Sequence, residues 1–279
     1  MSDLSDRVVL VTGAAGSLGV HLVKQLLKLG ATVRAFDNNE YGLFLLGHEI
    51  EGNKERRLLV GDVKDKDRVK MALKGVDYVI HAAALKNIDL TEYNVPEVIN
   101  TNIVGTLNLI LGALDQTTQS SFLTVSSDKA VNPSNLYGAT KYVEEKVTLW
   151  ANGVSNHTRF SCVRMPNFYD AHGNVFDKWA IQQRQNKPLT ITDPEVTRWF
   201  IKTEDAAAFT IKALREMSGG EIFIPNEKVQ ERKIIDLLPK DYPWEKIGLR
   251  LNEKLNEELY TKEEQKVMED RKWAWVIRK

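Results

Sequence analysis

Three glycines spaced three residues apart constrain the fold of this chain more than any other feature. They belong to the string TGAAGSLG, which joins an apolar, β-branched run at residues 7–12 to a helical apolar pattern at residues 17–29. Glycines in such a turn permit a tight bend, close approach of backbone N–H groups to a phosphate, and close packing of helix on strand. The positive end of the helix dipole then faces the phosphate. The turn predicts a dinucleotide site with contacts from Gly13, Gly16, Ser17, Leu18 and Gly19.

Strands and helices alternate along the part of the chain that follows this turn. Short apolar runs predict strands at residues 7–12, 31–37, 57–60, 76–81, 121–126 and 160–164. Helical spacing predicts helices at residues 17–29, 65–73, 96–114 and 137–150. Strands that alternate with helices form a parallel sheet with helices on both faces. We therefore predict an α/β fold with a doubly wound parallel sheet of the Rossmann type.

The pattern loosens after residue 164. It predicts a polar loop at 167–174, helices at 176–184 and 203–217, a short strand at 221–225, and a charged, mostly helical tail from residue 241. We expect a Rossmann domain over residues 1–165 that carries the catalytic site. We expect a smaller substrate-binding lobe over residues 166–279, partly interwoven with the sheet.

The charge balance and the single cysteine argue against several classes of protein. Lys plus Arg and Asp plus Glu both number 38, so the zero net charge gives no general reason to bind nucleic acid or an anionic membrane. Cys162 is the single cysteine, which excludes an intrachain disulfide, and the histidines lack metal-ligand spacing. The acidic start lacks signal-peptide features, and no apolar run approaches the roughly 20 residues of a membrane span. We expect a cytoplasmic protein without metal.

Acidic and small residues follow the predicted strands at the edge where the cofactor would lie. Asp37 ends the second strand, where a carboxylate hydrogen-bonds the ribose of NAD and repels the 2′-phosphate of NADP. Asn38 and Asn39 follow it, without an arginine to hold that phosphate. NAD is therefore the expected cofactor, with NADP as the alternative. The further predicted contacts are Asp62, Val63, Ala82, Ala83, Ala84 and Asn102.

A Tyr–Lys pair supplies the first catalytic pattern. Tyr137 and Lys141 are four residues apart at the start of a predicted helix, so they share one face. The ammonium of Lys141 is expected to lower the pKa of Tyr137, so that the phenolate can take a proton from a sugar hydroxyl. Ser127, at the end of the preceding strand, can hydrogen-bond the same substrate oxygen. The alternative is an ordinary surface pair, and Ser127 and the glycine turn favour the catalytic interpretation.

The acid–base neighbours Asp128 and Lys129 indicate the type of reaction. An alcohol dehydrogenase or a sugar 4-epimerase needs only the hydroxyl, the tyrosine and the lysine. An additional acid and base suggest elimination: a C4 ketone acidifies the C5 proton, Lys129 removes it, and Asp128 protonates the departing C6 hydroxyl. The alternative is a capping aspartate beside a solvated lysine.

These motifs together resemble a known family. The chain is similar to the extended short-chain dehydrogenases of polysaccharide biosynthesis, and specifically to C5-inverting UDP-N-acetylglucosamine 4,6-dehydratases. The resembling strings are TGAAGSLG, GDVKD, HAAALK, NTNIVGTLN, SSDKAVNPSNLYGATK, PLTITDPEVTRWF and EKLNEEL.

The resemblance implies a role for each matched residue. Ser127 would assist, Asp128 and Lys129 would perform the elimination, and Tyr137 and Lys141 would perform the oxidation. The implied substrate contacts are Lys86, Asn167, Thr190, Thr192, Arg198, Arg250 and Glu253. UDP-N-acetylglucosamine would be the substrate, and inversion at C5 the implied outcome.

The chain departs from the family pattern around the sugar and the nucleotide. Where the family has Arg-Asp-Glu after the second strand, this chain has Asn38-Asn39-Glu40, which supports NAD. The family's Arg-Tyr-Gly-Asn is Arg164-Met165-Pro166-Asn167 here. The sugar therefore stays open, as do a C4 epimerase or ketosugar reductase and, from another class, a non-catalytic NAD-binding regulator. A homo-oligomer that packs through helices 96–114 and 137–150 is expected by analogy.

Overall fold

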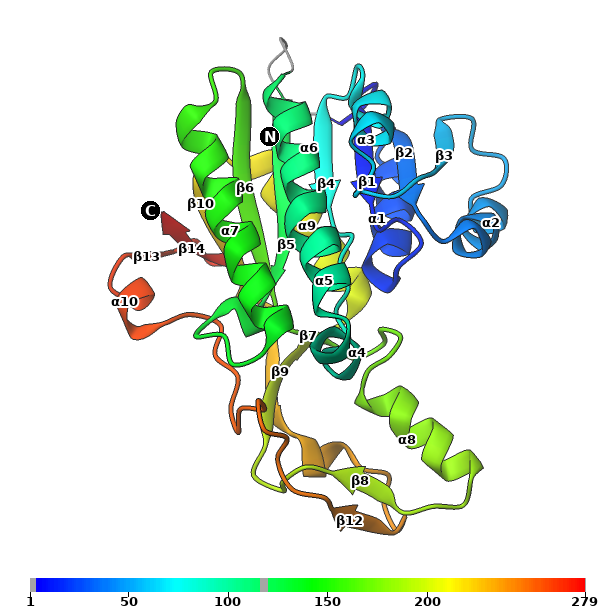
Figure 1. The fold of residues 1–279 in the computed structure, drawn as a ribbon, viewed down its shortest axis with the longest axis vertical. Helices are drawn as coiled ribbons and strands as arrows, with labels where there is room; N and C mark the ends of the chain where they lie inside the picture. The colour runs from blue at the N-terminus through cyan, green and yellow to red at the C-terminus, as the bar shows by residue number, and fades with distance from the viewer. Residues whose placement is uncertain (1–3, 116–119, 279) are drawn as a thin grey trace.

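A nine-stranded sheet forms the centre of the molecule (Figure 1). The computed structural model describes residues 4–115 and 120–278, so the first three residues of the acidic start lie outside the described part. In spatial order the strands are β13 (Met268–Asp270), β14 (Ala274–Arg278), β10 (Glu221–Pro225), β6 (Thr158–Met165), β5 (Ser120–Ser127), β4 (Tyr78–His81), β1 (Val8–Thr12), β2 (Thr32–Asp37) and β3 (Arg56–Val60).

The strand order confirms the predicted α/β class. Seven strands pair in parallel, in the order β3-β2-β1-β4-β5-β6-β10. The pairings of β14 with β10 and of β13 with β14 are antiparallel. An order that reverses beside β1 is the doubly wound arrangement, in which ligands bind beyond the carboxyl ends of the strands.

Helices cover both faces of the sheet. Helices α1 (Ser17–Lys28) and α9 (Thr203–Glu216) pack against each other on one face. Helices α3 (Lys66–Leu73), α6 (Gly105–Leu114) and α7 (Leu136–Val154) cover the other face, nearer the viewer in Figure 1. Strand side chains alternate between the two cores, as the period of a strand requires: Val9 and Val11 join the α1 side and Leu10 joins the α6 side.

Two helices of this region, α2 (Glu40–Glu49) and α4 (Ile88–Tyr93), were not predicted, and one predicted helix is subdivided. Helix α2 begins after Asn39, whose side chain accepts a hydrogen bond from the Gly42 backbone, and its weak apolar periodicity explains why the pattern missed it. The predicted helix at 96–114 consists of α5 (Val95–Val98), the π-helix η1 (Ile99–Val104) and α6. Helix α4 precedes it.

This stretch also contradicts one expectation. Val95–Leu114 is long and apolar enough to cross a membrane by length and composition alone, although no such run was expected. Its inward face packs in the core through Leu109, Ile110 and Ala113, and the core helices of globular proteins pass the same test.

A small lobe lies beyond the carboxyl ends of the strands (Figure 1). It contains a three-stranded sheet, a two-stranded sheet and one helix around a core that includes Trp179, Leu189 and Phe200. Its elements are β7 (Asn167–Phe168), α8 (Val175–Arg184), β8 (Leu189–Ile191), β9 (Thr197–Ile201), β11 (Gln230–Lys233), η3 (Ile234–Leu237) and β12 (Trp244–Lys246). Strands β10, β13 and β14 follow residue 166 yet belong to the large sheet, and the boundary after residue 165 stays a prediction.

The predicted helical tail is wrong. Of the residues described after 241, only the short α10 (Lys262–Gln265) is helical, and β12, β13 and β14 are strands. The lysines and glutamates of the tail favour a helix locally. Tertiary contacts outweigh that preference, because Arg198 donates to the backbone carbonyls of Lys254 and Leu255 while β14 pairs with β10.

Candidate active site

A cavity of about 690 Å³ lies at the carboxyl ends of the parallel strands. It extends from the glycine turn after β1 to the small lobe, and its volume is in the range of small-molecule sites. Every predicted site residue except Asn102 lines it: Gly13, Gly16, Ser17, Leu18, Gly19, Asp37, Asp62, Val63, Ala82, Ala83, Ala84, Lys86, Ser127, Asp128, Lys129, Tyr137, Lys141, Asn167, Thr190, Thr192, Arg198, Arg250 and Glu253.

The glycine turn has the shape that a pyrophosphate requires. Gly13 has a φ of +68°, and a Cβ there would lie 2.7 Å from the Ala83 nitrogen. A Cβ on Gly19 would collide with the Gly13 carbonyl, so this third glycine lets α1 pack against the turn. Gly16 is the N-cap of α1 and no side chain caps this helix, which leaves first-turn N–H groups to donate to a ligand. The cradle therefore fits the phosphates of a dinucleotide.

Asp37 closes the side of this cradle. Its carboxylate accepts hydrogen bonds from the backbone nitrogens of Ala15 and Asn39, both at 2.9 Å, which fixes it beside the turn. Arg34 turns away and donates to backbone carbonyls at the end of α3. Asp62 accepts from the Lys64 backbone nitrogen at 2.9 Å, at the next strand end. The geometry matches a ribose-binding carboxylate without an arginine for a 2′-phosphate.

The start of α7 brings Tyr137 to the end of β5. Asn135 caps the helix by accepting from the Gly138 nitrogen at 2.8 Å. A Cβ on Gly138 would collide with the Lys129 carbonyl, so the glycine allows α7 to lie against η2 (Asp128–Ala130). Ser127 then lies beside Tyr137, whereas the Ser126 hydroxyl donates to Glu145 at 2.7 Å. The predicted Ser–Tyr–Lys group is thus assembled from Ser127.

The expected effect of Lys141 on Tyr137 is wrong for this structure. Burial raises the pKa of Tyr137 well above its usual value, the charge of Glu144 adds to the rise, and a hydrogen bond with Ser127 opposes it. The ammonium of Lys141 is paired with Glu144 one turn further along α7, and both side chains are buried. The carboxylate offsets the charge that would have favoured the phenolate.

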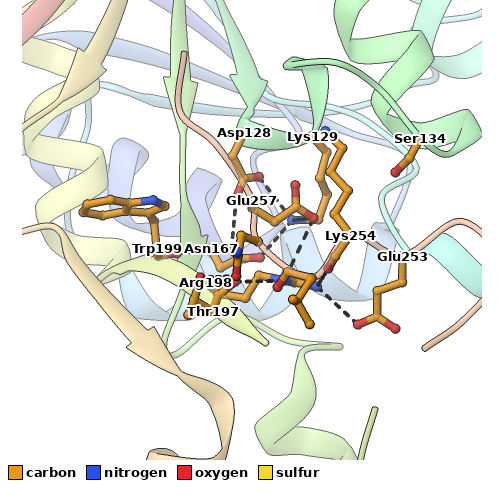
Figure 2. A network of polar contacts seen from close by, with 12 residues as sticks. Asp128, Lys129, Ser134, Asn167, Thr197, Arg198, Trp199, Glu253, Lys254 and Glu257 are labelled. Atoms are coloured by element: carbon orange, nitrogen blue, oxygen red, sulfur yellow. Dashed lines mark hydrogen bonds and ion pairs between the residues drawn. The ribbon is translucent and has the colours of Figure 1, made fainter. Parts of the chain in front are cut away.

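Asp128 and Lys129 form the centre of a polar network (Figure 2). Lys129 Nζ donates to Asp128 Oδ1 at 3.1 Å and to Asn167 Oδ1 at 3.0 Å. Asn167 Nδ2 donates in turn to Asp128 Oδ2 at 3.1 Å, and the Ser127 hydroxyl donates to Asp128 Oδ1 at 2.8 Å. Asp128 is 1% exposed and therefore depends on these partners. The alternative interpretation, a capping Asp128 beside a solvated Lys129, does not describe this buried, hydrogen-bonded pair.

The decisive comparison is with protein families. A family model described as "Polysaccharide biosynthesis protein" matches residues 9–279. The chain belongs to the polysaccharide-biosynthesis protein family. This confirms the resemblance found in the sequence.

Among three relatives of this chain, two have named activities of the expected kind. The UDP-N-acetylglucosamine 4,6-dehydratase (inverting) of Campylobacter jejuni is 38% identical over 258 residues, which cover 89% of this chain and 76% of the dehydratase. A protein of Methanocaldococcus jannaschii described as an uncharacterized membrane protein is 41% identical, over 98% of this chain and 86% of its own length. A UDP-glucose 4-epimerase of Rickettsia rickettsii is 29% identical, over 95% of this chain and 81% of the epimerase. The expectation of an enzyme of the extended short-chain dehydrogenase type is confirmed.

Solved structures agree with the fold. Pen from Bacillus thuringiensis has a TM-score of 0.91 and 32% identity, and the match covers 99% of this chain and 90% of that chain. DesIV, the dTDP-glucose 4,6-dehydratase of Streptomyces venezuelae with NAD and TYD bound, has a TM-score of 0.81 at 21% identity, over 93% and 90% of the two chains. The second likeness concerns the fold alone.

One predicted contact, Asn102, does not line the cavity, and a second, Arg198, lines it but is engaged by backbone carbonyls. Asn102 is buried, and its amide joins the Leu85 backbone to the Thr140 hydroxyl, so it positions the loop after β4 instead of facing the cavity. Arg198 is 9% exposed, and its guanidinium donates to the carbonyls of Thr197, Lys254 and Leu255. The structure thus uses Arg198 to fasten the C-terminal segment beside the site.

The other predicted substrate residues border the small-lobe end of the cavity. Thr192 donates to Glu253 at 3.0 Å, and Arg250 pairs with Asp89 at 3.2 Å. Lys86 donates to the His172 carbonyl at 3.0 Å, and burial lowers its pKa against the opposing charge of Asp177. Thr190 is held through its backbone and hydroxyl by α8.

Sequence reasoning missed two buried carboxylates. Glu257 Oε1 lies 3.8 Å from Lys129 Nζ and 3.9 Å from Arg198 Nε (Figure 2). The string EKLNEEL was noticed, but no local signal separates Glu257 from its exposed neighbour Glu258. The second is Glu144, whose position one turn after Lys141 was a signal available in the sequence.

Proposed function

We propose that the protein is a nucleotide-sugar 4,6-dehydratase that uses NAD and acts on UDP-N-acetylglucosamine. The observation that carries this proposal is the hydrogen-bonded pair of Asp128 and Lys129, which lines the same cavity as Tyr137 and Lys141. An epimerase needs the Tyr–Lys pair alone, whereas a dehydratase also needs an acid and a base for elimination.

The cofactor part of the cavity suits NAD. The glycine turn and the first turn of α1 would hold the pyrophosphate, and Asp37 would hold the adenosine ribose. Lys141 would hold the nicotinamide ribose. NAD, when bound there, would supply a temporary acceptor for the hydride of C4 that is later returned to C6, so no cofactor would be consumed.

Tyr137 would begin the reaction by taking the proton of the C4 hydroxyl. This step requires the phenolate form, so the raised pKa of this phenol must fall before it. Ser127 would hydrogen-bond the same oxygen and hold it in place, because both side chains line the cavity at the end of β5. The loss of hydride and proton leaves a ketone at C4, which acidifies the C5 proton. The chain's contribution here is orientation and proton transfer.

Asp128 and Lys129 would perform the elimination with one shared proton. Transfer of a proton from the ammonium to the carboxylate along their hydrogen bond produces an amine and a carboxylic acid without changing the total number of protons. The amine takes the C5 proton, and the acid protonates the C6 hydroxyl, which leaves as water. The pair ends as it began, and the proton that C5 later regains balances the one that Tyr137 removed.

The small lobe would select the sugar nucleotide. Lys86, Asn167, Thr190, Thr192, Arg250 and Glu253 remain our proposed substrate contacts. Arg198 would act indirectly, by fixing the backbone of residues 254 and 255. Protonation of C5 from the face opposite Lys129 would invert that centre, as the resemblance implies. A cytoplasmic homo-oligomer is proposed by analogy with the family.

Mass spectrometry of UDP-N-acetylglucosamine incubated with the protein and NAD tests the proposal. The expected product has lost one water. The epimerase of Rickettsia rickettsii and the Tyr137–Lys141 pair support a C4 epimerase as the second candidate. That enzyme would yield an isomer of unchanged mass, which would reject dehydration.

A further inference from the structure

Glu144 occupies a position that the proposed mechanism does not use. Tyr137, Lys141 and Glu144 stand at positions i, i+4 and i+7 of α7, so they share one face of the helix. The side chain of Glu144 is 0% exposed and that of Lys141 is 3% exposed. A carboxylate buried to this degree is costly unless its oxygens have partners.

The carboxylate is satisfied on one side only. Glu144 Oε2 accepts a hydrogen bond from Lys141 Nζ at 2.5 Å. Glu144 Oε1 is buried, with no hydrogen-bond partner among residues 4–115 and 120–278. The neighbouring Glu145 differs, because it has a full set of partners in Arg164 and Ser126. The hydrogen bond from Lys141 is therefore the main polar contact of the Glu144 carboxylate among the described residues.

We propose that Glu144 is a positioning residue that acts through Lys141 to set how readily Tyr137 releases its proton. With Glu144 ionised, the charge of Lys141 is offset and Tyr137 keeps its proton. With Glu144 protonated, the charge of Lys141 acts on Tyr137 and on the ribose that it would hold. Proton abstraction from the C4 hydroxyl then depends on a group that does not touch the substrate.

The surroundings support a change of protonation at Glu144 within the neutral pH range. Burial raises the pKa of Glu144 to about 7, although Lys141 opposes the shift. Burial and Lys141 lower the pKa of His81 to about 3, so the imidazole stays neutral there. The titratable groups that interact with the pair are Tyr137 and Glu145 of α7, His81 of β4 and Cys162 of β6. Around them, Asp128 of η2 acts on Tyr137, and Arg164 of β6 acts on Cys162 and Glu145. Burial raises the pKa of Cys162, and Glu145 raises that of Arg164 against burial, so both keep their protons.

Glu144→Gln tests the proposal, because glutamine can still accept the hydrogen bond from Lys141 but carries no charge. The readout is the pH profile of kcat/KM on UDP-N-acetylglucosamine, so this arm rests on the proposed function. A charge about 10 Å from a phenol shifts its pKa by about one unit at an effective dielectric constant near 20. On the acidic side of this profile, kcat/KM rises with pH; this rise, the acid limb, is expected at a pH about one unit lower in the variant than in the wild type. A limb that stays in place, or a uniform loss of rate at all pH values, would overturn the proposal.

Two further variants distinguish an effect of the Glu144 charge from an effect of disturbed folding. Glu144→Asp keeps the charge and should leave the acid limb near its wild-type position. Glu145→Gln changes the next buried carboxylate of the same helix, so it should weaken the fold through Arg164 without moving the limb. If Glu144→Gln does not fold, Glu144→Ala replaces it with the same expected shift. An equal shift in Glu145→Gln would contradict the assignment to Glu144.

A second readout needs neither substrate nor cofactor. A carboxyl group whose pKa is higher in the folded than in the unfolded state stabilises the fold at low pH, and this stabilisation is lost as the pH rises through the folded value. The Tm of the wild type should therefore fall relative to that of Glu144→Gln between about pH 5 and about pH 8, by several degrees. A constant difference would overturn the proposal. If no nucleotide sugar is converted, the proposed function fails, while this measurement still decides whether Glu144 titrates.

Discussion

The two lysines of the site are held in different ways. Lys141 has its partner Glu144 one turn away on the same helix, so a single element fixes the pair. Lys129 is held by its neighbour Asp128, by Asn167 of β7 and by Glu257 of the C-terminal segment. The oxidation half of the proposed reaction thus depends on α7, whereas the elimination half depends on the small lobe lying against the sheet. Single substitutions should therefore impair the oxidation half or the elimination half of the reaction selectively.

Tyr137→Phe is expected to have the largest effect. Removal of the phenol removes the group that takes the C4 proton, so the first step and everything after it should slow by about 10²–10⁴-fold. Binding of NAD should persist, because the glycine turn is untouched. The loss of turnover is measured by mass spectrometry and the binding of NAD by isothermal titration calorimetry. Turnover within a few-fold of the wild type would remove Tyr137 from the mechanism.

Asp128→Asn should affect only the second half. The elimination is expected to slow by about 10²–10⁴-fold because the acid that protonates the C6 hydroxyl is gone. Oxidation at C4 should continue, so reduced nicotinamide should accumulate on the enzyme and be visible by its absorbance. If the variant neither oxidises the sugar nor accumulates reduced cofactor, although it is folded and binds NAD, the two lysine sites are not separable.

Glu257→Gln measures how much Lys129 depends on the C-terminal segment. Loss of the charge next to Lys129 and Arg198 should misplace the elimination pair and lower kcat by about tenfold to a hundredfold, with little change in KM. Glu258→Gln is the matched control, since Glu258 is the adjacent, exposed glutamate. Equal effects of the two variants would show that Glu257 has no specific role.

Asp37→Ala should have the smallest effect and should spare both lysine sites. Loss of the carboxylate at the end of β2 should weaken NAD binding by about tenfold, which corresponds to one charged hydrogen bond. The preference for NAD over NADP should shrink. Titration with both cofactors measures this change, and an unaltered preference would show that Asp37 does not face the ribose.

The part of the site that could be predicted is the part built from neighbours in sequence. The glycine turn, the Tyr137–Lys141 pair and the Asp128–Lys129 pair each lie within one element or one connection, and the alternation of strands and helices fixes where those connections meet. The tail could not be predicted, because contacts with Arg198 and pairing with β10 decide its course. Glu257 lies more than a hundred residues from Lys129 in sequence, so only the fold could bring the two together.

The direction of the pKa shift at Tyr137 was missed for a related reason. The helical spacing correctly placed Lys141 beside the tyrosine face. Whether a lysine lowers the pKa of a phenol depends on what else the lysine contacts and on how deeply both groups are buried. Here burial and Glu144 prevail over Lys141. Composition and spacing do not report burial, so the sign of the shift required coordinates.

The most direct test of the account is to follow the hydrogen on C4. UDP-N-acetylglucosamine that carries deuterium at C4 is incubated with the protein and NAD, and the product is examined by mass spectrometry and NMR. The account predicts a product that has lost one water and carries the deuterium on C6, because the hydride leaves C4 and returns to C6 within the same site. Deuterium that stays on C4 of an isomer of unchanged mass would contradict it.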